Sequence, residues 1–115
     1  MTSIVRQTLP VLAFSALIPV AAGDEFKGQI QPFLKSYCVA CHGPKVQKGS
    51  IRVDRLTANM SDRREAALWS RMLEAIEFGE MPSDKAEKFP TRMEARFVQN
   101  WIIDSLHQAG LELEE

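Results

Sequence analysis

Two cysteines and a histidine stand within five residues of one another, in the sequence Cys-Val-Ala-Cys-His at positions 38–42. These are the only two cysteines in the 115-residue chain. Cys-x-x-Cys-His is the attachment motif of a c-type haem. The two thiols add to the vinyl groups of the porphyrin, and the histidine can bind the iron through a ring nitrogen. The motif therefore predicts one covalent haem c, held by Cys38 and Cys41, with His42 as an iron ligand.

A haem that carries electrons commonly has a second axial ligand, often a methionine thioether. Met81 is the predicted ligand, because it stands far enough from His42 for the chain to pass around the haem and return on its other face. Pro82 also restricts the backbone beside it. The alternatives are a methionine that only fills a gap in the core, and His107 as the sixth ligand. The remaining methionines are interpreted otherwise: Met1 leaves with a leader, Met60 lies in a polar loop, Met72 is core and Met93 lies in a first helical turn.

The first 23 residues carry a single charge, Arg6, which precedes an almost wholly apolar run over 9–22. A basic start, a short apolar stretch and small residues at its end are typical of a secretory signal peptide. The alternative is an uncleaved membrane anchor, but the run is shorter than the roughly 20 residues of a spanning helix. We predict a signal peptide over 1–23, cleaved after Gly23 or the residue before it. The domain is then 24–115, in the periplasm or an equivalent exported compartment, with no stable membrane span.

Composition agrees with one small globular domain: 45% of the residues are hydrophobic, 25% are charged and the net charge is -1. Binding to nucleic acid would require a strongly basic face, so no such partner is expected. A domain of this size buries only a modest core. A haem would supply a large apolar body around which that core forms.

The predicted elements are three helices joined by long loops. In the first, apolar residues from 26 to 37 recur at helical spacing, and Asp24 is the expected N-cap. Pro32 does not suit a helix interior. We therefore expect either a kink at Pro32, or a regular part that begins near Gln31 with the proline in its first turn.

The second helix is predicted over 62–78 and the third over 91–110. Residues 62–65 resemble a capping box with aspartate at its head, and residues 91–94 form a complete one, Thr-x-x-Glu. Gly79 and Gly110 are the expected stops. The fold class is thus all-α, a small cytochrome c-like domain around one haem. Its helical faces are predicted to comprise Leu68, Trp69, Met72, Leu73 and Ile76 in the second helix, and Phe97, Val98, Trp101, Ile102 and Leu106 in the third.

Four cations follow the haem motif within a short loop: Lys45, Lys48, Arg52 and Arg55. The simplest interpretation is a solvated loop. Alternatively, Arg52 or a neighbour pairs with a haem propionate, because arginine can contact carboxylates through two hydrogen bonds. A docking patch for an acidic redox partner is a third interpretation.

An ordered set of segments resembles the planctomycete-type cytochrome c domain. The segments are 37–44 (Tyr-Cys-Val-Ala-Cys-His-Gly-Pro), 47–54 (Gln-Lys-Gly-Ser-Ile-Arg-Val-Asp), Trp69, 79–82 (Gly-Glu-Met-Pro) and 101–102 (Trp-Ile). The resemblance implies that Cys38 and Cys41 hold the haem, that His42 is the proximal ligand and that Met81 is the distal ligand. Two loop positions depart from the family pattern: Ser50 replaces a second glycine and Ser83 a second proline.

These observations predict an electron carrier with His/Met ligation, rather than an enzyme, that exchanges electrons with redox partner proteins. Three alternatives remain. One is a five-coordinate haem that senses gas or reduces peroxide. Another is a thiol-disulfide oxidoreductase, although its Cys-x-x-Cys belongs in a βαβ context and this sequence predicts helices only. The third is a zinc site built on Cys38, Cys41 and His42, for which no fourth ligand stands at a typical spacing.

Overall fold

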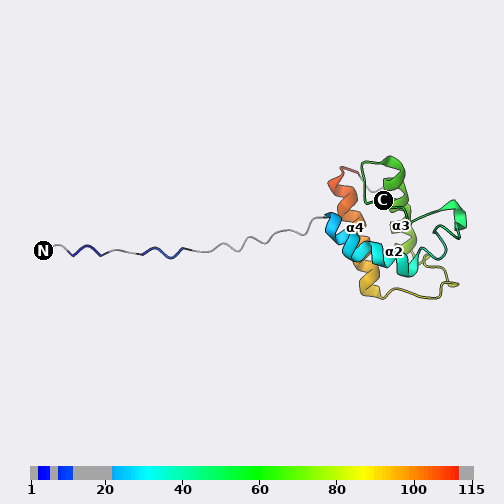
Figure 1. The fold of residues 1–115 in the computed structure, drawn as a ribbon, viewed down its shortest axis with the longest axis horizontal. Coiled ribbons are helices and arrows are strands. Elements are labelled where there is room, and N and C mark those ends of the chain that lie inside the picture. The colour runs from blue at the N-terminus through cyan, green and yellow to red at the C-terminus, as the bar shows by residue number, and fades with distance from the viewer. Residues whose placement is uncertain (1–2, 6–7, 12–21, 112–115) are drawn as a thin grey trace.

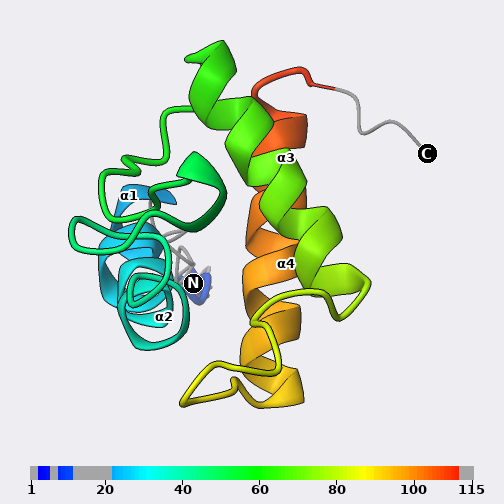
Figure 2. The ribbon, with the colours of Figure 1, turned by 90° about the vertical axis from the view of Figure 1, so that its right-hand side faces the viewer.

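The computed structural model describes residues 3–5, 8–11 and 22–111. It contains one N-terminal helical run and two long helices, α3 and α4, which lie side by side (Figures 1 and 2). The part described contains no strand, so the all-α prediction is confirmed. In chain order the elements are α1 (Ala22–Glu25), the π-helical turn η1 (Phe26–Ile30), α2 (Gln31–Tyr37), the 3-10 turn η2 (Lys48–Ser50), α3 (Arg63–Glu77) and α4 (Arg92–Gln108).

The predicted signal peptide, residues 1–23, falls largely outside the described residues, and its cleavage stays a prediction. α1 begins at Ala22, so Asp24 lies within the first helical turn. The prediction of Asp24 as N-cap is therefore wrong, because the helix starts earlier than the apolar spacing indicated. Among the residues that the structure describes, none of the helices has the length and hydropathy that a membrane span requires.

The N-terminal helical run changes its hydrogen bonding at Pro32. The N–H of Gln31 donates to the carbonyl of Phe26, five residues back, which is the wider spacing of a π turn. Regular α-helix then begins at Gln31, with Pro32 in its first turn, where its missing N–H costs little. Of the two outcomes expected around Pro32, a regular helix beginning near Gln31 is confirmed.

The two long helices begin where the sequence predicts. Asp62 caps α3 by accepting hydrogen bonds from the backbone N–H groups of Arg64, at 2.9 Å, and Glu65, at 3.3 Å. Thr91 and Glu94 form the complete capping box of α4, with reciprocal bonds of 3.1 and 3.0 Å. At 62–65 only half of the predicted box is present, because the Glu65 side chain turns away from the helix end.

The core forms where the N-terminal helical run packs on α3 and α4. Phe26 stacks on Trp101 at 5.8 Å, and both rings contact Trp69, whose side chain is fully buried. The prediction that Trp69 is core is confirmed. Met60 lies in the loop before α3 as predicted, although its side chain is buried, and the prediction that Phe97 belongs to the buried face of α4 is wrong, because Phe97 is 39% exposed.

The carboxylate of Glu65 fastens the loop that precedes α3. It accepts hydrogen bonds from Thr57 through its N–H, at 2.6 Å, and its hydroxyl, at 2.9 Å. It also accepts from the N–H of Ala58, at 2.8 Å, and from Nε1 of Trp69, at 3.3 Å. Ala58 has a φ of +67°, a conformation that is unfavourable for a residue with a Cβ. Glu65 therefore holds an unfavourable turn in place against the core.

We expect Glu65→Ala to lower the free energy of unfolding by about 1–3 kcal/mol, because bonds to a charged acceptor are lost and two of their donors, the N–H of Ala58 and Nε1 of Trp69, are partly buried. Glu77→Ala is the matched control, since Glu77 is an exposed glutamate on the same helix. Chemical denaturation of the haem-loaded protein measures both. Equal unfolding free energies for the two variants would contradict the role of Glu65.

Candidate haem-binding cleft

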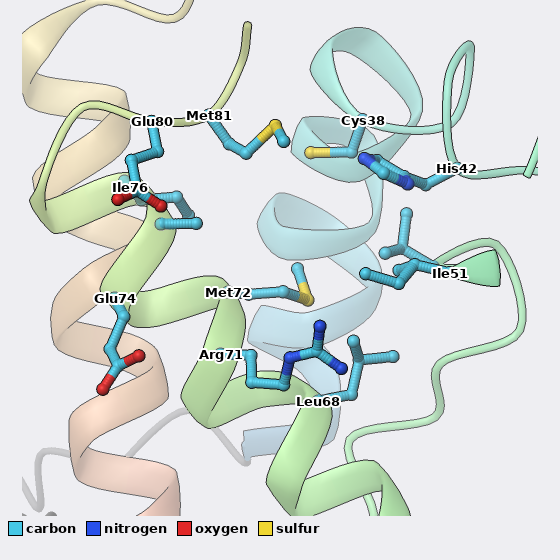
Figure 3. Close-up of a pocket in the computed structure, with 12 residues that line it drawn as sticks. Cys38, His42, Ile51, Leu68, Arg71, Met72, Glu74, Ile76, Glu80 and Met81 are labelled. Carbon is cyan, nitrogen blue, oxygen red and sulfur yellow. The ribbon is translucent and has the colours of Figure 1, made fainter. Parts of the chain in front are cut away.

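A cleft opens between α3 and the end of α2, and its two cavities have volumes of about 280 and about 110 Å³. Both cavities are lined by Cys38, His42, Ile76 and Met81, so they lie next to each other. Figure 3 shows the larger cavity: α3 forms one wall, and the motif together with Ile51 forms the other. The cleft thus brings all four predicted haem-binding residues together, although Cys41 lines only the smaller cavity.

The haem motif forms a tight turn directly after α2. The N–H of Cys38 donates to the carbonyl of Leu34 at 2.9 Å, which ends the helix. The carbonyl of Cys38 then accepts from the N–H groups of Cys41, at 3.3 Å, and His42, at 3.0 Å. This turn directs the three motif side chains to the same cleft. Both cysteines are free thiols, which is the state in which they can add to vinyl groups.

Gly43 follows the motif at a point where a side chain would not fit. The residue is buried, and a Cβ would collide with the carbonyl oxygen of Val39 and come within 2.8 Å of its Cγ1. Both contacts are to the spacer residue of the motif itself. The glycine therefore permits the chain to pass close behind the turn that carries the two thiols.

The imidazole of His42 is oriented by a backbone carbonyl. Its Nδ1 lies 3.0 Å from the carbonyl oxygen of Lys48. Because a carbonyl can only accept, Nδ1 carries the proton and Nε2 keeps its lone pair. A metal-binding histidine typically has this arrangement, in which the second nitrogen donates to a carbonyl or carboxylate. His42 is thus prepared to bind iron through Nε2.

The loop that supplies this carbonyl returns through two consecutive left-handed residues. Gly49 has a φ of +65° and Ser50 a φ of +58°. Ser50 is the position at which the sequence departs from the glycine of the planctomycete pattern. The serine keeps the glycine-like conformation, at a cost of about 1–2 kcal/mol for a residue with a Cβ. The backbone conformation of the loop is therefore one that suits a glycine at position 50.

Met81 reaches the cleft from the loop after α3. The N–H groups of Glu80 and Met81 both donate to the carbonyl of Ala75, at 2.8 and 3.0 Å, which fastens the loop to the helix end. In Figure 3 the Met81 side chain extends from the loop at the end of α3 toward Cys38 on the opposite wall of the cleft. The peptide bond that follows, to Pro82, is cis. His107, the alternative ligand, is exposed in the last turn of α4 and is not among the residues that line either cavity.

Three apolar side chains of α3 face the cleft and lack a full cover. Leu68, Met72 and Ile76 pack against the core on one side and line the larger cavity on the other. Each is only half-buried, although the sequence places them on the same face as the buried Trp69 and Leu73. An apolar planar group between α3 and Ile51 would complete their burial. The cleft therefore fits a porphyrin in its lining as well as in its ligands.

Arg52, which the sequence offered as an alternative partner for a haem propionate, pairs with another residue of its own loop. Its guanidinium forms a two-bond ion pair with the carboxylate of Asp54, at 2.6 and 3.0 Å. This pairing lowers the pKa of Asp54. Arg52 is not among the residues that line either cavity, whereas its neighbours Ile51 and Val53 are. Pairing of Arg52 with a propionate thus gains no support.

Two alternatives for the cysteines gain no support from the cleft. Burial raises the pKa of the Cys38 thiol to about 11, whereas a redox-active Cys-x-x-Cys requires a lowered pKa and a thiolate. Within residues 3–5, 8–11 and 22–111, no group of three or more histidine, cysteine, aspartate or glutamate side chains is arranged to hold a metal ion.

A contact that the sequence did not predict joins the motif helix to α4. The hydroxyl of Tyr37 donates to the carboxylate of Glu94, with distances of 2.9 and 3.1 Å to its two oxygens. The bond raises the pKa of Tyr37. The pKa of Glu94 is lowered, by the N–H of Thr91 first and by Tyr37 second. The sequence identified Glu94 only as part of a helix cap, because a local pattern cannot relate Tyr37 and Glu94, which are 57 positions apart.

An all-α chain whose Cys-x-x-Cys-His turn, oriented histidine and methionine loop line one apolar cleft has the design of a c-type cytochrome. Residues 38–84 match the family model described as Planctomycete cytochrome C. The match begins at the first motif cysteine and ends just after Met81-Pro82. This match, over 47 of the 115 residues, supports a planctomycete-type cytochrome c domain in this part of the chain, and such a domain suggests haem-based electron transfer. No curated protein and no solved structure matches the chain.

Proposed function

We propose that this protein is an exported monohaem electron carrier. Cys38 and Cys41 hold one haem c through thioether bonds, and His42 and Met81 are its axial ligands. The observation that carries the proposal is that His42 and Met81 line both cavities of the cleft, with His42 already oriented by the Lys48 carbonyl. When bound, the haem supplies a one-electron Fe(III)/Fe(II) couple.

The residues of the chain would keep that couple reversible. A neutral imidazole and a neutral thioether suit both oxidation states, so little rearrangement of the ligands accompanies transfer. Thioether ligation favours the reduced state relative to a second imidazole. The hydrogen bond from Nδ1 of His42 fixes the ring and raises its basicity. Leu68, Met72 and Ile76 exclude water from one face of the site.

The mass and the visible spectrum of the protein test this function. Coexpression with a c-type maturation system is expected to yield a mature chain of residues 24–115 carrying the mass of one haem. The spectra of both redox states should be those of a six-coordinate, low-spin haem c. A chain without a covalent haem adduct would refute the proposal, and a retained N-terminal segment would refute cleavage of the signal peptide.

One observation favours a second candidate function. Met81 is 43% exposed on its loop, whereas the His42 ring is oriented by a hydrogen bond. If the thioether does not bind the iron, the haem is five-coordinate and open to gas or peroxide. A high-spin ferric spectrum in the unmutated protein would support this candidate over the electron carrier.

A further inference from the structure

We propose that Arg71 is the residue that neutralises a haem propionate and so raises the reduction potential of this protein. The inference rests on the proposed function, and it assigns a residue that the sequence analysis did not single out. Arg71 takes the place of Arg52 as the candidate partner of the propionate, because Arg52 is paired with Asp54.

Arg71 is placed within the cleft rather than on a distant surface. Of the described residues that line the larger cavity, it is the single cation, accompanied by the carboxylates of Glu74 and Glu80. Figure 3 shows its guanidinium turned toward Met72 and Leu68, while the Glu74 carboxylate is directed the other way. In the part of the chain that the structure describes, Arg71 forms no ion pair and no hydrogen bond to a side chain.

Arg71 lies at the end of the cleft where the propionates of a bound haem are expected. In haem, the two propionates are carried on the ring edge opposite the vinyl positions that react with the cysteines. Cys41 lines only the smaller cavity, Cys38 lines both, and Arg71 lines only the larger one. Arg71 and Leu68 therefore mark the end of the cleft that is remote from the thiols, where carboxylates are expected. The second cation of the cleft, Lys48, lines only the smaller cavity at the cysteine end.

The chemistry of arginine suits this role. A guanidinium is permanently charged and can donate two parallel hydrogen bonds to one carboxylate. An uncompensated propionate stabilises Fe(III) through its negative charge. A guanidinium beside it cancels that charge and shifts the equilibrium toward Fe(II). Of the other charges of the cleft, Glu74 stands on α3 near Arg71, whereas Glu80 lies beside Met81 at the other end, and the Arg52–Asp54 pair belongs to the opposite wall.

The test is the reduction potential of Arg71→Gln, measured on the haem-loaded protein. We expect a normal haem mass and a normal ligand spectrum. The redox equilibrium should shift about three- to tenfold toward the oxidised form, and tenfold corresponds to about 59 mV for one electron. Arg71→Lys keeps the charge and should keep most of the potential. Arg52→Gln, which removes a cation already paired with Asp54, should shift the equilibrium less than twofold.

Infrared difference spectra between the two redox states provide a second readout. With ¹³C-labelled propionates, the carboxylate bands should move in Arg71→Gln and stay in place in Arg52→Gln. Unmoved bands together with less than a twofold redox shift in Arg71→Gln would overturn the proposal and leave Arg71 a solvated surface residue. Equal shifts in both variants would also overturn it, because they indicate a general effect of surface charge. Failure of the electron-carrier function is distinct, since it would be seen in the unmutated protein as a missing haem adduct or couple.

Discussion

Replacing both Cys38 and Cys41 by alanine is expected to leave a chain with no haem adduct and little stable structure. Leu68, Met72 and Ile76 line a cavity of about 280 Å³ that the haem would fill. Full burial of a large apolar side chain contributes about 1.5–3 kcal/mol to stability. A haem that completes the burial of these three half-buried side chains would therefore add several kcal/mol. The total stability of a domain is only about 5–15 kcal/mol. Loss of a ligand that binds the folded state alone removes its whole contribution.

Mass spectrometry and circular dichroism measure the two consequences separately. The double variant should show the mass of the polypeptide alone and a helical signal far below that of the haem-loaded protein. Ala40→Ser is the matched control, because it changes an exposed spacer residue and leaves both thiols at their spacing. That variant should carry haem normally. A double variant that keeps the full helical signal would show that the helices do not depend on the haem.

Local sequence carried enough information for the motif and for the beginnings of α3 and α4. The cysteines and His42 lie within one turn, and their joint approach to the cleft follows from a few backbone bonds between neighbours. The caps at Asp62 and Thr91 likewise depend on residues two or three positions away. Such features are determined by nearby backbone geometry, which spacing in the sequence reports directly.

The remaining features depend on where distant segments meet. The cluster of cations after the motif offered Arg52 or a neighbour as an alternative partner for a propionate, but the sequence could not show that Asp54 pairs with the Arg52 guanidinium. From the sequence alone, Arg71 has the pattern of an exposed residue on a helix, and only the position of the cleft shows its role. The same holds for Glu65, which serves the preceding loop instead of its own helix end. Side-chain direction across a cleft is a tertiary property, and periodicity along one helix does not determine it.

Met81→Ala is expected to produce the second large effect, a change of ligand at the iron. The variant should keep covalent haem, because Cys38, Cys41 and His42 are untouched. The thioether-to-iron charge-transfer band should disappear, and the ferric haem should become five-coordinate or bind water. Without the thioether, the reduction potential should fall by on the order of 0.1 V, within the range of about 0.8 V that axial ligands cover.

Met72→Leu is the matched control for Met81, since it removes the sulfur of the other methionine that lines the larger cavity and conserves the volume of the side chain. Absorption spectra and redox titration of both variants decide which sulfur serves the iron. If Met72→Leu loses the charge-transfer band and Met81→Ala keeps it, the ligand is on α3 and the loop after it has another role. If neither variant changes the spectrum because the unmutated protein has no such band, the haem is five-coordinate. The sixth position of the iron would then be open to gas or peroxide, and the exposed Met81 would not be an iron ligand.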